Sequence, residues 1–128
     1  MIETIEVAKA NFRVDEGPTQ NRLPLLRLRR VLERMEADLS ATLDVQTLAL
    51  ESGYSRNHFL RMFRAAVGST PHQYLLRLRV KRAEVLMEDK SMRLIDVALA
   101  CGFSSHSHLS RIFRQVTGET PSRYRRNI

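Results

Sequence analysis

The chain is 128 residues long and carries 21 basic against 14 acidic side chains, a formal net charge of +7. This length fits one domain or two very small ones, and it is too short for most large catalytic folds. No run approaches the roughly 18 apolar residues of a membrane span and the N-terminus lacks a signal pattern, so we expect no membrane partner and a cytoplasmic location.

The first predicted elements are a linker or tail and one helix. Residues 1–22 show no sustained hydrophobic period and are interpreted as a linker or tail. Apolar residues then recur at helical spacing and predict a first helix that covers the next pair of helices, namely Leu25, Leu28, Leu32, Met35 and Leu39.

Two short helices joined by a tight turn are predicted next. Asp44 is placed to cap a helix that stops at Gly53, where a left-handed backbone is tolerated. Ser55 caps a second helix, which ends at Gly68. The apolar stripe of that second helix falls at i, i+3, i+4 and i+7, on Phe59, Met62, Phe63 and Ala66.

A long helix is predicted from Pro71, which sits at the favourable first helical position, to about Asp89. Its apolar residues lie on two sides, which suits a helix that packs against two neighbouring units.

The last third of the chain repeats the helix pair. Residues 43–74 align with 92–124 at an offset of 49 that becomes 50, so that Ala49 and Gly53 meet Ala98 and Gly102. A second pair of helices is thus predicted, the later one with a buried stripe of Leu109, Ile112, Phe113 and Val116. In this copy Arg93 stands where Asp44 would cap, so the start of its first helix is less well specified.

The repeated pattern is typical of a helix-turn-helix, since two closely crossing helices need a small contact residue and a turn at positive φ. We therefore predict an all-α fold of two helix-turn-helix subdomains joined by a long linker helix. Its predicted parts are a tail at 1–22, a first subdomain at 23–70, a connecting helix at 71–90 and a second subdomain at 91–128.

Charge is concentrated where a nucleic acid would require it. Residues 1–22 hold three basic and four acidic side chains, so the remainder carries 18 against 10, a net charge of +8. The second helix of each copy contains no carboxylate. Its outward face is polar and cationic, which is what a helix needs to lie in a major groove without repelling phosphate.

Single residues outside these faces allow other interpretations. His106 and His108 do not share a helix face and no cysteine or acid cluster accompanies them, so no metal site and no cofactor is expected. Cys101 takes the place of Ser52 in the other copy, which favours a packed thiol over a redox sensor. The C-terminal arginines, Arg123, Arg125 and Arg126, could equally contact phosphate or remain in solvent.

Three classes of function compete. The first is a sequence-specific regulator that binds double-stranded DNA. The alternative is a basic helical module that binds an acidic protein partner. An enzyme is not expected, because there is no glycine-rich phosphate loop, no nucleophile elbow and no zinc-ligand set, and no catalytic residue is assigned.

At these residues the chain resembles the DNA-binding domain of the AraC/XylS family of bacterial transcription regulators. The most specific part is residues 95–114 with Gly118, Pro121 and Tyr124, and the resemblance covers about residues 24–126. It implies seven helices, two recognition helices in adjacent major grooves, and transcriptional activation through RNA polymerase. Many members add an N-terminal effector or dimerisation domain, and others consist of this domain alone. Residues 1–22 resemble an interdomain linker more than a finished N-terminus, so this chain is interpreted as a fragment of a longer regulator.

The resemblance also implies site residues. Family base contacts fall on Asn57, Leu60, Arg61, His106, Ser107, Ser110 and Arg111. Leu60 departs from the polar residue often present there, and is expected to touch a thymine methyl instead. Candidates for phosphate contacts are Ser55, Arg56, Arg64, Ser104, Ser105 and Arg114.

Overall fold

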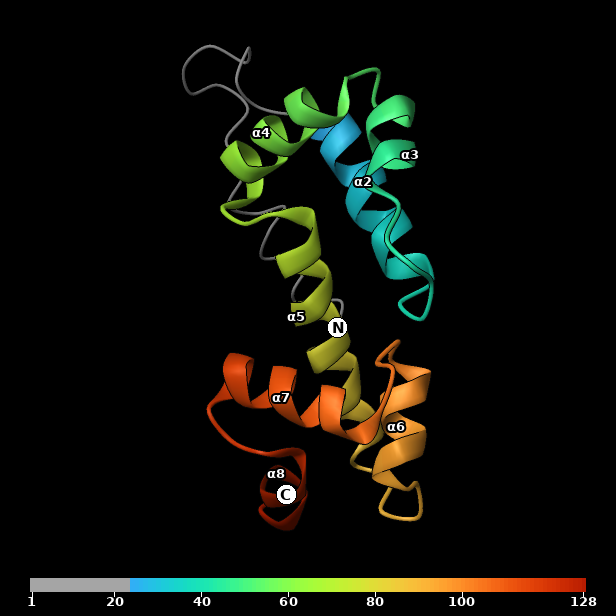
Figure 1. Cartoon of the computed structure of the whole chain (residues 1–128), viewed down its shortest axis with the longest axis vertical. Coiled ribbons are helices and arrows are strands. Elements are labelled where there is room, and N and C mark those ends of the chain that lie inside the picture. Colours follow the sequence, from blue (N-terminus) through green and yellow to red (C-terminus); the bar gives the residue numbers. More distant parts are fainter. Residues whose placement is uncertain (1–23) are drawn as a thin grey trace. The chain divides into compact units, whose positions relative to one another are not determined.

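A computed structural model describes residues 24–128, and in that range the chain forms seven α-helices and no strand. The all-α prediction is confirmed, whereas the predicted tail at 1–22 lies outside the described residues. The helices, labelled in Figure 1, are α2 (Leu25–Ala37), α3 (Val45–Glu51), α4 (Arg56–Val67), α5 (Pro71–Leu86), α6 (Leu94–Ala100), α7 (His106–Thr117) and α8 (Pro121–Arg126). None of these helices is long and apolar enough to cross a membrane.

The described chain divides into two compact units. Unit 1 contains 24–38 and Leu43–Leu75, and unit 2 contains Leu39–Thr42 and Leu76–Ile128. Helix α5 contributes its first residues to unit 1 and the rest to unit 2. The subdomain boundaries expected at residues 70 and 91 stay a prediction.

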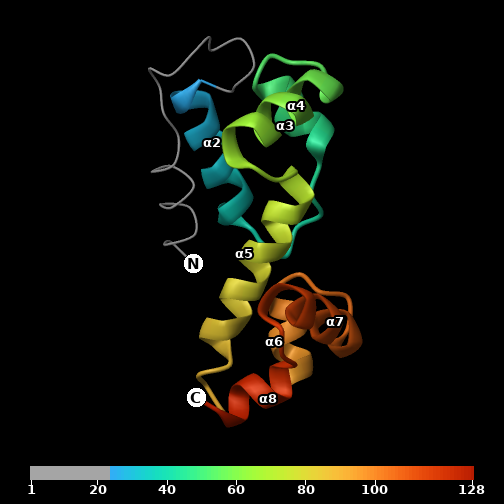
Figure 2. The ribbon, with the colours of Figure 1, turned by 90° about the vertical axis from the view of Figure 1, so that its left-hand side faces the viewer.

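Unit 1 is built from α2, α3, α4 and the start of α5, and Figure 2 shows α3 and α4 together beside α2. Its largest fully buried side chains are Leu28 and Leu32 from α2 and Phe59 and Phe63 from α4. The Phe63 ring meets the ring of Tyr74 edge-on, with 6.1 Å between their centroids. The spacing of these apolar residues along each helix therefore defines the face that each helix buries.

Unit 2 has its own core. It gathers Val80 and Ala83 of α5, Met87 directly after that helix, Val97 and Ala98 of α6, Leu109, Ile112 and Phe113 of α7, and Cys101 and Phe103 from the turn. The Cys101 thiol is fully buried, and this burial raises its pKa to about 11, while the charges of Arg82 and Arg79 oppose the shift. The thiol is therefore protonated and packed in the core. This was predicted because Cys101 takes the place that Ser52 has in the first copy of the repeat.

The C-terminal helix α8 is tied to the end of α5 by Arg125. Its guanidinium donates to the carbonyl oxygens of Met92 at 2.7 Å and of Met87 and Asp89 at 3.3 Å. Figure 2 shows α8 beside that end of α5. Of the three C-terminal arginines whose roles the sequence left open, this one has an intramolecular role.

Three expectations about individual residues need correction. Leu39 was placed on the first helix, but α2 ends at Ala37 because Asp38 is extended, and Leu39 is buried in unit 2. Helix α5 ends at Leu86, short of Asp89, whose carboxylate accepts from the N–H and O–H of Ser91 and stabilises a turn. Val116 is 43% exposed, because the buried stripe of α7 ends at Phe113.

Candidate nucleic-acid interface

Each unit contains one helix-turn-helix, and the two turns have the same backbone geometry. Gly53 and Gly102 follow α3 and α6 with φ of 79° and 89°, which is the left-handed region that favours glycine. The backbone N–H of the residue after each glycine donates to the carbonyl oxygen of a fully buried alanine. The bond runs from Tyr54 to Ala49 and from Phe103 to Ala98, and is 2.9 Å long in both units. The repeat found in the sequence is therefore a repeat of structure.

The second helix of each pair starts at a serine cap. The Ser55 hydroxyl accepts from the His58 N–H at 3.3 Å, and the Ser105 hydroxyl accepts from the His108 N–H at 3.0 Å. Each cap satisfies one of the free N–H groups at the helix start. Each serine hydroxyl accepts in this bond and still has its own hydrogen to donate.

Ser104, the other candidate at the start of α7, is used differently. Its backbone N–H donates to the Nδ1 atom of His108 at 3.1 Å, and its hydroxyl lies 3.1 Å from the same nitrogen. Both groups of Ser104 are therefore engaged with His108 inside the unit.

A histidine in each second helix packs against the aromatic residue of the preceding turn. His58 meets Tyr54 edge-on with ring centroids 4.8 Å apart, and His108 meets Phe103 in the same way at 5.2 Å. This pair of contacts was not predicted from the sequence. The signal was available, because His58 and His108 occupy matching positions of the repeat.

The outward faces of α4 and α7 carry the residues predicted for base contact. Asn57 and Arg61 are exposed and Leu60 is half-buried on α4. On α7, His106, Ser107 and Arg111 are exposed and Ser110 is half-buried. Each unit thus brings its own predicted residues onto one accessible helix face.

The arginines predicted for phosphate contact flank these faces. Arg56, Arg64 and Arg114 are all exposed, and neither α4 nor α7 contains an acidic residue. A shallow hollow of about 250 Å³ lies along α4 next to Arg61, lined also by His58, Met62 and Ala65. In the described part of the chain, no three His, Cys, Asp or Glu side chains gather in a way that could hold a metal ion.

The first helix of each pair is held differently at its start. The Asp44 carboxylate accepts from the N–H and O–H of Thr47 at 3.2 and 2.6 Å, and these bonds lower the pKa of that carboxyl. Arg93, in the matching position, makes no cap and instead pairs with Asp96 at 2.8 Å. The predicted difference between the starts of α3 and α6 is confirmed.

Known proteins are similar to this chain in sequence and in fold. A family model described as a helix-turn-helix domain matches residues 48–127. The transcriptional regulator GbdR of Pseudomonas aeruginosa is 37% identical over 84 residues, which cover 66% of this chain but only 23% of GbdR. The probable transcription factor PqrA of Proteus vulgaris is 33% identical over 99 residues, covering 76% of this chain and 81% of PqrA.

Solved structures of other transcription regulators have a similar fold. The DNA-binding domain of the transcriptional factor AdpA, crystallised with a target DNA, superposes with a TM-score of 0.72 at 37% identity, covering 79% of this chain and 91% of that one. An AraC-type regulator from Chromobacterium violaceum superposes with a TM-score of 0.73 at 33% identity, covering 80% and 91%.

The repeated helix-turn-helix units define the class, a DNA-binding transcription regulator. The chain belongs to the family of AraC-type helix-turn-helix regulators. It spans about a quarter of the length of GbdR.

Proposed function

We propose that the chain reads a specific double-stranded DNA sequence by placing α4 and α7 in adjacent major grooves. The observation that carries the proposal is the occurrence, once in each unit, of a serine-capped helix with an exposed and acid-free outer face. Cations and hydrogen-bond donors on such a face attract phosphate and can reach base edges in the major groove.

The proposed base-reading residues differ in chemistry. Arg61 and Arg111 are exposed, and their planar guanidinium groups suit the two acceptors of guanine. Asn57 suits adenine, and half-buried Leu60 suits a thymine methyl. On α7 the remaining readers are His106, Ser107 and Ser110.

Phosphate contacts would fix the register of both helices. We assign them to the exposed guanidinium groups of Arg56, Arg64 and Arg114, which carry no sequence information themselves. The hydroxyls of Ser55, Ser104 and Ser105 complete this set at the helix starts, where the helix dipole favours an anion.

Selection of bound sites from a random DNA pool tests the proposal. The expected result is a two-part motif whose centres lie about one helical turn, roughly 10 base pairs, apart. Arg61→Ala and Arg111→Ala should each reduce affinity for the selected site by about 1–3 kcal/mol and relax one half of the motif. Equal losses on selected and random DNA would reduce both arginines to backbone contacts.

For the whole regulator we propose a bacterial transcription activator that works in the cytoplasm, contacts RNA polymerase and carries no catalytic site. The support is the resemblance to AraC-type regulators together with the names of relatives such as GbdR. An N-terminal effector or dimerisation domain would occupy part of the length that GbdR has beyond this segment. The test is transcription by purified polymerase from a promoter that carries the selected site. Adding the regulator should increase transcription, and a decrease would indicate a repressor.

A further inference from the structure

Arg79 is a buried charge that hydrogen-bonds to the main chain. Its side chain is 7% exposed, and it donates from Nε to the carbonyl oxygen of Leu39 at 2.8 Å and from Nη2 to that of Ala41 at 2.9 Å. Burial lowers the pKa of this group, but an arginine remains protonated in proteins. The carbonyl oxygens therefore replace the water that the guanidinium has lost.

The same guanidinium supports the turn ahead of α7. A Cβ atom placed on Gly102 would lie 2.8 Å from Arg79 Nε and 2.4 Å from the Leu39 carbonyl oxygen. The turn thus rests directly on the bonded pair of Arg79 and Leu39. Phe103 comes next in the chain and holds His108 on α7 by their edge-on ring contact, so the position of the turn decides where α7 begins.

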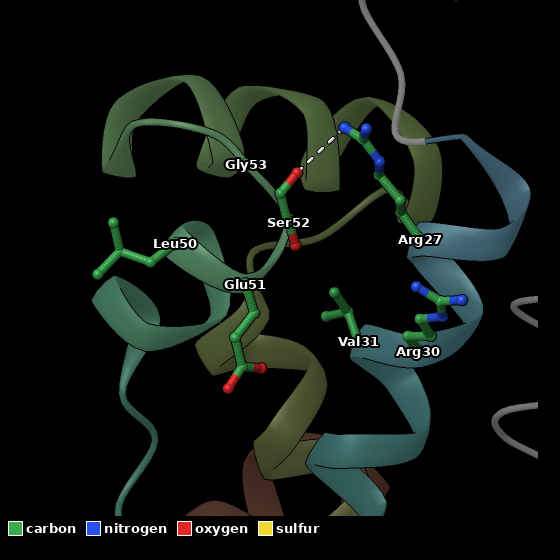
Figure 3. Close-up of a pocket in the computed structure, with 7 residues that line it drawn as sticks. All are labelled: Arg27, Arg30, Val31, Leu50, Glu51, Ser52 and Gly53. Carbon is green, nitrogen blue, oxygen red and sulfur yellow. Dashed lines mark hydrogen bonds between the residues drawn. The ribbon is translucent and has the colours of Figure 1, made fainter.

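An arginine performs a related role in unit 1. Arg27 of α2 donates from Nη1 to the carbonyl oxygen of Ser52 at 3.1 Å, as Figure 3 shows. Its guanidinium carbon also lies 5.4 Å from the centroid of the Tyr54 ring. A Cβ atom on Gly53 would lie 3.9 Å from Arg27 Nη1, an ordinary contact distance.

The two arginines occupy corresponding places on the supporting helices. Leu28, Val31 and Met35 of α2 are buried in unit 1. The residues 52 positions later are buried in unit 2, and they are Val80 and Ala83 of α5 and Met87 directly after it. The same offset relates Arg27 to Arg79. The surroundings differ, because Arg27 is exposed beside an open hollow of about 360 Å³ between α2 and α3 (Figure 3), whereas Arg79 is enclosed.

We propose that Arg27 and Arg79 are positioning residues for DNA reading, each of which holds the turn ahead of the recognition helix in its own unit. The inference rests on the proposed function, in which α4 and α7 read bases. Arg79 has the larger effect, because it is a buried residue that makes two hydrogen bonds, whereas Arg27 is an exposed residue that makes one.

The test compares half-site discrimination among matched variants. The DNA probes are the selected two-part site and two derivatives, each with one half scrambled. Arg79→Met should reduce discrimination at the half read by α7 by about tenfold and leave the other half within about twofold. Arg27→Met should give the reverse pattern with a smaller loss, about threefold.

Charge is controlled separately from position. Arg82→Met removes an exposed arginine from the same helix as Arg79, and should reduce affinity for all three probes by the same factor. Arg79→Lys keeps the charge but loses the planar fork that bonds two carbonyl oxygens. This variant should therefore lose half-site discrimination as Arg79→Met does.

Amide nitrogen–proton spectra supply a readout without DNA. In Arg79→Met and Arg79→Lys, the signals of Gly102, Phe103 and His108 should shift while those of unit 1 stay in place. If unit 2 loses its dispersed signals in both variants, Arg79 is required for folding and the positioning role is wrong.

The remaining outcomes separate the two proposals. Wild-type protein that shows no half-site discrimination overturns both base reading and positioning. Discrimination that persists in Arg79→Met overturns positioning alone.

Discussion

Gly102 lies so close to Leu39 that a Cβ atom on the glycine would come within 2.4 Å of the Leu39 carbonyl oxygen. Gly118 has nearly the same backbone, with φ of +88° against +89°, yet an added Cβ there would meet nothing within 4 Å. The two glycines belong to the same unit, so they separate the effect of backbone conformation from that of a close contact.

Gly118→Ala should lower the free energy of unfolding of unit 2 by about 1–2 kcal/mol, the strain of a left-handed alanine. Gly102→Ala carries the same strain and also displaces backbone, so its total loss should reach about 3 kcal/mol or more. Native-state hydrogen exchange at the amides of Ile112 and Phe113, which lie in the unit 2 core, measures both. Equal losses of unfolding free energy in the two variants would show that the backbone at Leu39 can move away from a Cβ atom on residue 102 without a free-energy cost.

Leu60 should recognise the methyl group of one thymine. Replacing that thymine by deoxyuridine, which lacks only the methyl, should weaken wild-type binding by about 1 kcal/mol. Leu60→Ala should bind the two DNAs equally, because the apolar contact is gone. Ser110→Ala on the other recognition helix serves as the control, and its thymine-to-uracil ratio at this position should match the wild type. Competition binding measures the ratio, and a Leu60→Ala variant that keeps the preference would contradict the assignment.

Arg64 and Arg114 should contribute charge without sequence information. Each substitution to alanine should make the slope of log affinity against log salt shallower by about 0.9 and leave the preferred sequence unchanged. Arg34→Ala is the matched control, because Arg34 is already paired with Glu51 at 2.8 Å on α2 and α3. A changed sequence preference in Arg64→Ala or Arg114→Ala would instead make that arginine a base reader.

The free energy of unfolding of each unit should fall at alkaline pH, because each unit buries one group with a raised pKa. The group is Tyr74 in unit 1 and Cys101 in unit 2. Burial, aided by the charge of Glu36, raises the pKa of Tyr74 from 10.0 to about 12, and burial raises that of Cys101 from 9.0 to about 11. Each group ionises more readily in the unfolded chain than in the folded one. Its contribution to the free energy of unfolding is therefore fully present below its unfolded pKa and is lost as the pH rises to its folded pKa.

The loss should amount to about 2–3 kcal/mol for each group, at about 1.4 kcal/mol for each pH unit. Tyr74→Phe should flatten the decline in unfolding free energy between pH 10 and 12, and Cys101→Ala the decline between pH 9 and 11. Urea unfolding across this pH range measures the slopes. Slopes identical to the wild type would mean that other groups cause the alkaline loss.

Much of the fold arises from local rules that the sequence displays. The spacing of Phe59, Met62 and Phe63 predicts the buried face of α4, and the positions of Asp44 and Ser55 predict two helix starts. These features depend on hydrogen bonds and side-chain contacts three or four residues apart, so a short stretch of sequence contains all the necessary information. Because residues 92–124 repeat residues 43–74, the same spacing predicts the second pair of helices.

The candidate site could be predicted for a related reason. Once α4 and α7 are helices with one buried stripe, the opposite face must be exposed, and Asn57, Arg61, Ser107 and Arg111 fall on it or at its edge. The aromatic contacts of His58 and His108 are also short in sequence, and the repeat contained the signal for them.

By itself, therefore, the sequence determined the helices, their turns, their caps and the two faces proposed to read DNA. Only the tertiary structure decided that Leu39 leaves α2 and is buried in unit 2, that Arg79 bonds to it, and that Arg125 ties α8 to the end of α5. The hydrogen bonds of Arg79 and Arg125 join residues more than thirty positions apart. No helical period encodes such a contact, because a main-chain carbonyl oxygen looks the same in every residue until the fold places an arginine beside it.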